Sequence, residues 1–98
     1  MIVGVHHRRV PDFLAQRTAD FPGEAFVAVA DVRVGADEEL FVLDAAYHLT
    51  QHYASPWTEG GQICRLTARH ARSTSVGDVL TIGERAYAVL PVGFKRLD

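Results

Sequence analysis

The segment from residue 25 to residue 34, Ala-Phe-Val-Ala-Val-Ala-Asp-Val-Arg-Val, constrains the fold more than any other part of the chain. Side chains of a strand alternate between two faces, so a period of two is the signature to look for. One face receives five apolar side chains: Phe26, Ala28, Ala30, Val32 and Val34. The other face begins with two valines and ends with Asp31 and Arg33. We therefore predict a central strand, apolar on both faces in its first half and on one face in its second.

A helix is predicted over residues 38–52. Three carboxylates at positions 37–39 suit the positive end of a helix dipole. A broad apolar arc of the helical wheel holds seven side chains: Leu40, Val42, Leu43, Ala46, Tyr47, Leu49 and Tyr53. The opposite arc holds Asp44, His48, Gln51 and His52, with Phe41 as the one apolar exception. This pattern is typical of a helix that covers one face of a sheet.

The remaining segments complete an α+β pattern. A short helix is predicted over residues 11–19, and a loop over residues 54–62. Further strands are predicted at 2–6, 63–68, 76–82, 86–90 and 92–97, with a type II′ turn at Gly83-Glu84. We expect a small antiparallel sheet of about 4–5 strands, covered by one main helix, with a short N-terminal helix.

Composition excludes several classes of protein. The chain has 98 residues, of which 48% are hydrophobic and 22% charged, so it is too apolar to be intrinsically disordered. A single domain over residues 1–98 is expected. One cysteine excludes a disulfide scaffold and a zinc finger. The N-terminus lacks the order of charge and apolar run that a secretory signal needs, and no stretch has the length of a membrane span, so a cytoplasmic protein without membrane contact is expected.

Charge is distributed unevenly although the total is only −2. Residues 1–64 hold four basic and nine acidic side chains, a net −5, whereas residues 65–98 hold six basic and three acidic ones, a net +3. The candidate binding face combines basic and aromatic side chains: Arg65, Arg69, His70, Arg72, Lys95, Arg96 and Trp57. The alternative is that these cations pair with the acidic half, within the domain or across a homodimer.

Candidates for catalysis or metal binding are weak. His48 and His52 have the i, i+4 spacing of two metal ligands, and Cys64 or His70 would have to supply a third, but no HExxH pattern accompanies them. Cys64 has no local signature of a catalytic nucleophile, and free cysteine is commonly a small buried hydrophobe. No GxGxxG motif or P-loop is present. We therefore predict no catalytic residue, metal or cofactor.

One segment carries a resemblance to a known family. It reads Arg72-Ser73-Thr74-Ser75-Val76-Gly77-Asp78-Val79, and Ala86-Tyr87 and Gly93-Phe94 follow it. It resembles the C-terminal signature of YodL-like proteins and their small actinobacterial relatives, and residues 46–51 and 56–58 resemble the helix and Trp loop that precede this signature in those relatives. The resemblance covers residues 26–97. It implies a setting on mobile genetic elements or in host-defence conflict, and it implies no catalytic residues.

The residues of this motif also have a direct physical interpretation. Ser73 and Ser75 can hold a turn through backbone hydrogen bonds, Gly77 permits a positive φ, and Asp78 can accept backbone N–H bonds. Tyr87, Gly93 and Phe94 complete the motif, with Gly93 letting Phe94 turn back onto the hairpin. We favour a structural role, with a binding face around Arg72 as the alternative. The leading hypothesis is a non-enzymatic module that binds a protein partner or itself. A nucleic-acid-binding accessory protein using residues 65–72 is the second.

Overall fold

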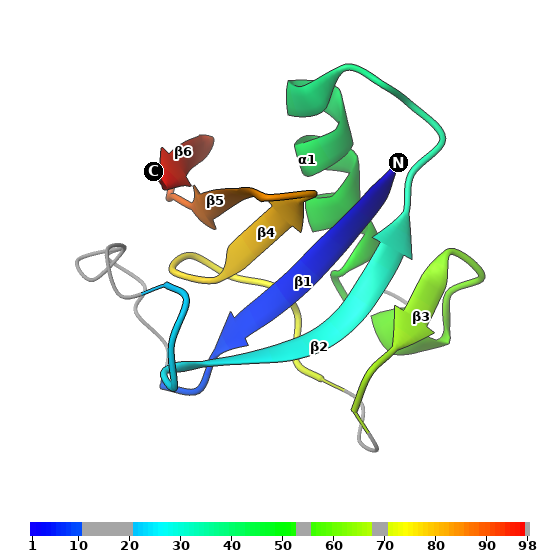
Figure 1. Ribbon diagram of the computed structural model, residues 1–98. Coiled ribbons are helices and arrows are strands. Elements are labelled where there is room, and N and C mark those ends of the chain that lie inside the picture. Colours follow the sequence, from blue (N-terminus) through cyan, green and yellow to red (C-terminus); the bar gives the residue numbers. More distant parts are fainter. Residues whose placement is uncertain (11–20, 53–55, 68–70, 98) are drawn as a thin grey trace.

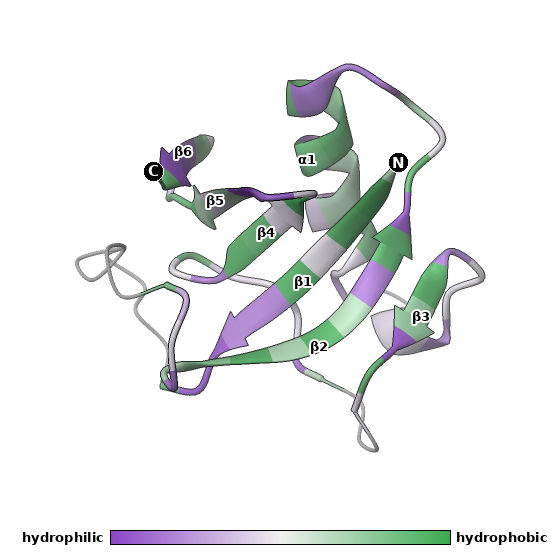
Figure 2. Cartoon of the chain, viewed as in Figure 1, coloured by the Kyte–Doolittle hydropathy of each residue, from purple (hydrophilic) through white to green (hydrophobic). Residues whose placement is uncertain are grey.

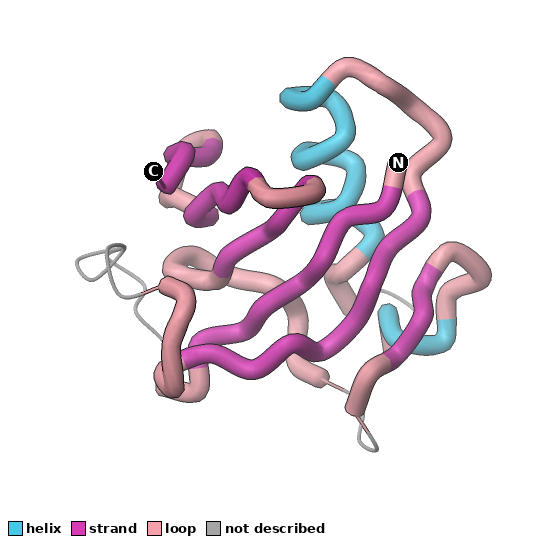
Figure 3. The backbone as a smooth tube through the Cα atoms, in the orientation of Figure 1, coloured by secondary structure: helices cyan, strands magenta, loops and turns pink. Residues whose placement is uncertain are grey.

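The computed structural model describes residues 1–10, 21–52, 56–67 and 71–97, which form one curved sheet and one α-helix (Figures 1 and 3). The elements follow in this order: β1 (Ile2–Arg8), β2 (Phe26–Arg33), α1 (Glu39–Leu49), the 3₁₀ turn η2 (Trp57–Glu59), β3 (Ile63–Arg65), β4 (Val79–Ile82), β5 (Arg85–Val89) and β6 (Phe94–Leu97). The sheet order is β3-β2-β1-β4-β5-β6, and every neighbouring pair is antiparallel.

The α+β class and the single main helix are confirmed, but the size of the sheet is not. It has six strands rather than 4–5, because the two weakest strand patterns both join it as edge strands, β3 at one side and β6 at the other. The short helix expected over residues 11–19 lies outside the described residues, and the described residues before β2 contain no helix. At the predicted hairpin turn, Gly83 has a φ of 59°, a conformation that favours glycine.

A β-bulge corrects the predicted alternation of β2. Val5 pairs with Ala30 and the next residue, His6, pairs with Ala28, so Val29 is an extra residue on β2. Because of the extra residue, the alternation of side chains between the two faces of the sheet is out of step before and after the bulge. Val29 and Ala30 are both buried in the main core, whereas Phe26 joins a separate small cluster with Val79 and Ala86. Strand β2 therefore contributes side chains to two apolar clusters, the small cluster at its start and the main core along the rest of the strand.

Helix α1 packs on the face of the sheet that carries the main core, and Figure 2 shows the apolar colour on both. Val42, Leu43 and Ala46 are its buried residues. Leu40, predicted on the core face, is instead 61% exposed, and the neighbouring Phe41 is 59% exposed. The helix also ends earlier than predicted, because Thr50 turns its hydroxyl back to the carbonyl oxygens of the last turn.

On the opposite face of the sheet, Gly4 lies beneath the side chain of Thr81. A Cβ atom at position 4 would overlap Thr81 Oγ1 and come within 3.2 Å of His6 Nε2. The two side chains above it lie within hydrogen-bonding distance, with 3.3 Å between His6 Nε2 and Thr81 Oγ1. The absence of a side chain at position 4 is thus what permits this cross-strand contact.

We expect Gly4→Ala to lower the free energy of unfolding by about 1–3 kcal/mol, because Thr81 must leave its rotamer and lose the contact with His6. Urea denaturation followed by circular dichroism measures the change. The double variant Gly4→Ala/Thr81→Ala removes the overlapping oxygen and should recover part of the loss. Equal stability of Gly4→Ala and the wild type would contradict the packing argument.

Candidate functional site

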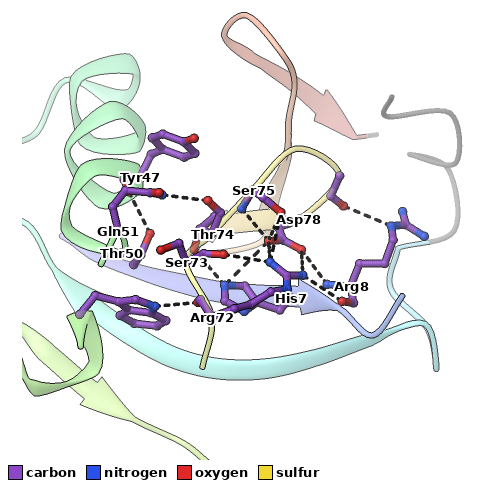
Figure 4. A network of polar contacts seen from close by, with 12 residues as sticks. His7, Arg8, Tyr47, Thr50, Gln51, Arg72, Ser73, Thr74, Ser75 and Asp78 are labelled. Carbon is purple, nitrogen blue, oxygen red and sulfur yellow. Dashed lines mark hydrogen bonds and ion pairs between the residues drawn. The ribbon is translucent and has the colours of Figure 1, made fainter. Parts of the chain in front are cut away.

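Asp78, which directly precedes β4 and is 1% exposed, lies at the centre of a network of polar contacts. Its carboxylate accepts hydrogen bonds from the backbone N–H groups of Arg8 and Ser75, both at 2.8 Å. It also accepts two from the Arg72 guanidinium, at 2.6 and 2.8 Å (Figure 4). Gly77, with a φ of 92°, provides the turn that brings the carboxylate to these donors. Asp78 therefore ties the loop at 72–78 to the end of β1.

Arg72 belongs to the same hydrogen-bond network. Besides its two bonds to Asp78, its guanidinium donates to the carbonyl oxygen of Arg8 at 3.0 Å and to that of Ser73 at 3.0 Å. It also lies 3.2 Å from Ser75 Oγ. Its side chain is still 37% exposed, so water reaches one side of the ion pair. Because most of its donors are already used, this arginine acts as a structural cross-link.

His7 forms the buried side of the network. Its Nε2 lies 2.9 Å from Thr74 Oγ1 and 3.9 Å from Asp78 Oδ2. Burial lowers the pKa of His7 to about 4, with Asp78 opposing the shift and Arg72 and His6 adding to it. The imidazole is therefore neutral at pH 7. The same ring nitrogen faces both the hydroxyl and the carboxylate, so this is not the arrangement of a hydroxyl nucleophile, base and orienting acid.

The loop at 72–78 is also bonded to the end of helix α1 and to η2. Gln51 Nε2 donates to the Thr74 carbonyl at 2.8 Å, and the Thr74 N–H donates to the Thr50 carbonyl at 3.0 Å. The indole N–H of Trp57 donates to the Arg72 carbonyl at 2.7 Å. These bonds make the predicted motif the place where β1, α1, η2 and β4 meet (Figure 4).

The predicted motif residues separate into two groups. Ser73 and Ser75 belong to the network, since Ser73 Oγ accepts from the backbone N–H of His52 and Ser75 donates its N–H to Asp78. Tyr87 is buried in the main core. Gly93 has a φ of 75° and Phe94 packs against the edge of that core, so these two lie on the β5–β6 hairpin.

The described members of the candidate basic face do not gather on one exposed surface. Arg65 lies on β3, whereas Lys95 and Arg96 lie on β6 at the other edge of the sheet. Trp57, proposed as a stacking residue, is only 4% exposed and uses its indole N–H inside the protein. Arg69 and His70 lie outside the described residues. Among the described members, only Lys95 and Arg96 are neighbours on one exposed strand.

The histidines weighed as metal ligands have other contacts. His48 Nε2 lies 3.7 Å from Asp44 Oδ2 on the exposed side of α1, and His52 Nδ1 accepts the backbone N–H of Trp57 at 3.2 Å. Cys64 is exposed on β3. Within the described ranges, no group of three or more His, Cys, Asp and Glu side chains is placed to hold a metal ion.

A groove that sequence reasoning missed lies between the start of α1 and β6. Its larger cavity, of about 380 Å³, is lined by Glu38, Leu40, Phe41, Asp44, Gly93 and Phe94. A cavity of about 170 Å³ shares Asp44, Gly93 and Phe94 and continues toward Tyr47 and Leu90. We call this the α1–β6 groove. The only hint of it in the sequence was Phe41, which did not fit the polar arc.

Comparisons with known proteins add no relative: no family model, no curated protein and no solved structure matches the chain. Of the helices in the described ranges, none combines the length and the apolar character that crossing a bilayer requires.

Proposed function

We propose that this protein is a non-enzymatic interaction module that binds a protein through the α1–β6 groove. The observation that supports this most directly is the exposure of large apolar side chains around the groove. Leu40 and Phe41, which line the groove, are 61% and 59% exposed. Val92, which directly precedes the groove residue Gly93 in the chain, is 89% exposed. Apolar side chains gathered at one place on a surface, with charged residues at the rim, are typical of protein interaction sites.

The structure of the Asp78 network supports a scaffold role for the YodL-like motif in this proposal. Its polar groups are bonded to one another and to the backbone, and its histidine is buried, so the network holds the fold rather than a ligand. The exposed apolar residues lie on different elements, α1 and the β5–β6 hairpin. Scaffold and binding surface are thus separate parts of the molecule.

We expect Phe41→Ser to weaken the capture of a protein partner by about 10-fold or more without unfolding the module. Loss of one exposed aromatic anchor typically weakens an interface by about 10-fold or more. Quantitative affinity capture with mass spectrometry measures the loss. Leu66→Ser is the matched control, because Leu66 is 51% exposed and follows β3 at the other edge of the sheet.

Capture that is equal for Phe41→Ser and the wild type would overturn the proposal. Binding of DNA or RNA that weakens steeply with salt would favour the nucleic-acid alternative instead. The mobile-element or host-defence setting and the cytoplasmic location stay predictions. The genes next to this one in its genome are the observation that tests the setting.

A further inference from the structure

We infer that the α1–β6 groove binds an extended segment of another protein, apolar and cationic in character, which pairs with the edge of strand β6. This inference rests on the proposed function and names the chemistry of the partner for the same surface. Binding by strand addition combines main-chain hydrogen bonds along a sheet edge with pockets that receive alternate side chains. An edge, an apolar pocket and a charge of one sign meet at this place.

The edge is formed by β6, the last strand of the sheet (Figure 1). Where the β5–β6 hairpin begins, the Leu90 N–H donates to the Gly93 carbonyl at 3.0 Å. Hydrogen-bonded pairs of an antiparallel ladder alternate with pairs that are not bonded to each other, and the next pair, Val89 and Phe94, is of the second kind. Indeed, Val89 uses both its N–H and its carbonyl oxygen on the segment that precedes β4. The backbone N–H and carbonyl of Phe94 therefore point away from β5.

Phe94 belongs to both the edge and the groove. Its side chain lines both cavities and packs against the main core, on the face of the sheet that α1 covers. Within the described ranges no strand lies on the other side of β6, and an edge of this kind is a template for pairing with another chain. A segment that pairs with Phe94 runs beside the groove, and every second side chain of that segment points to the face on which α1 lies.

The apolar lining of the groove requires apolar side chains in the bound segment. Leu40 and Phe41 are both more than half exposed, and together with Phe94 they line the cavity of about 380 Å³. An aliphatic or aromatic side chain of the segment fills this cavity and removes the two helix residues from water, which is favourable.

The charged lining requires cations. Among the described residues, the charged side chains that line the two cavities are both carboxylates, Glu38 and Asp44. Glu38 is exposed and makes no capping hydrogen bond to α1, and the contact of Asp44 with His48 is an exposed pair at 3.7 Å. Neither Lys95 nor Arg96 of β6 lines these cavities. The groove is therefore negative, so lysine or arginine in the segment complements it and an acidic segment is repelled.

The test begins with a phage-displayed library of random peptides, selected on the whole protein. We expect the enriched peptides to combine lysine or arginine with aliphatic or aromatic residues. The most enriched peptide, synthesised with a fluorescent label, is the probe, and fluorescence anisotropy gives its Kd. A library that yields no binding peptide, or that yields acidic ones, would overturn the inference.

Backbone N-methylation of the probe tests strand pairing without altering the protein. Two versions of the probe keep all side chains, and one carries N-methyl groups at the odd positions and the other at the even positions. Because alternate N–H groups of a strand face its neighbour, one version should bind about 10-fold less tightly or worse, and the other should bind like the probe. Equal affinities of the two versions would contradict strand addition.

The variant Glu38→Gln/Asp44→Asn tests the charge of the groove. It should bind the probe about 3-fold to 10-fold less tightly, and its affinity should depend less on salt, because both carboxylates are lost. The matched control is Glu24→Gln/Glu84→Gln, which removes the same charge from two exposed positions that do not line the groove. Equal affinities of the groove variant and the control would overturn the cationic partner.

Competition by the probe separates this inference from the proposed function. Capture of a host protein that depends on Phe41 but is not competed by the probe would support the function and overturn the added strand. Concentration-dependent dimerisation that the probe does not reverse would make a second copy the occupant and would also overturn the added strand. A probe that passes both tests, beside host capture that is equal for Phe41→Ser and the wild type, would support the strand-binding edge and overturn the proposed capture.

Discussion

Asp78→Asn should destabilise the fold by about 3–5 kcal/mol, because the buried carboxylate is the shared acceptor of four hydrogen bonds, two of them from backbone N–H groups that are left without a charged acceptor. The carboxylate is 1% exposed and accepts two bonds from Arg72 and one each from the N–H groups of Arg8 and Ser75. An amide has only one acceptor oxygen. Its NH₂ group would face the N–H donors of the network and cannot accept a hydrogen bond from them. The free energy of unfolding of a native protein is typically about 5–15 kcal/mol, so this loss is a large part of it.

Replacing Arg72, the other member of the ion pair, should lower the free energy of unfolding less than replacing Asp78. Arg72→Met leaves Asp78 with its two backbone donors, and Arg72 is partly exposed, so we expect a loss of about 1–3 kcal/mol. The double variant should lose less than the sum of the two, because the two residues act as a unit. Urea unfolding of all three variants gives the comparison, with Glu24→Gln as an exposed carboxylate control. A loss below about 1 kcal/mol for Asp78→Asn would contradict the network.

The turn at the centre of this network could be predicted from five neighbouring residues. Ser73–Ser75, Gly77 and Asp78 have the side chains that hold tight turns, and the structure uses Gly77 and Asp78 in this way. The long-range partners could not be predicted. His7 and Arg8 are 64 or more positions from the motif, and no local pattern indicates that β1 lies beside β4.

Two further differences have identifiable causes. The bulge at Val29 reverses the faces of β2, and an alternation read from sequence assumes one uninterrupted register. The groove was missed because a helical wheel shows where apolar side chains point but not how far the sheet extends. Leu40 points toward a part of the molecule that β6 does not fully cover, so it remains exposed.

Lowering the pH from 6.5 to 4 should remove about 3 kcal/mol of stability through His7, at 1.36 kcal/mol per pH unit for one proton. Burial lowers the pKa of His7 from 6.5 to about 4 in the folded protein. Between these values the unfolded chain binds a proton that the folded chain does not, so stability falls as the pH falls. Above pH 6.5 the contribution is fully present, because His7 is then neutral in both states.

Burial, rather than the charged groups that face His7, decides the direction of this effect. Asp78 favours the protonated ring, but Arg72 and His6 oppose it, and burial is the largest cause. We expect His7→Gln to flatten the dependence of the urea midpoint on pH between 4 and 6.5, because glutamine can still bond Thr74 but does not titrate. A smaller slope should remain from His6, whose pKa burial also lowers. The matched control is His48→Gln, which makes the same substitution on the exposed side of α1, away from the Asp78 network. Parallel curves for His7→Gln and the wild type would mean that the folded protein takes up the proton at His7 as easily as the unfolded chain does.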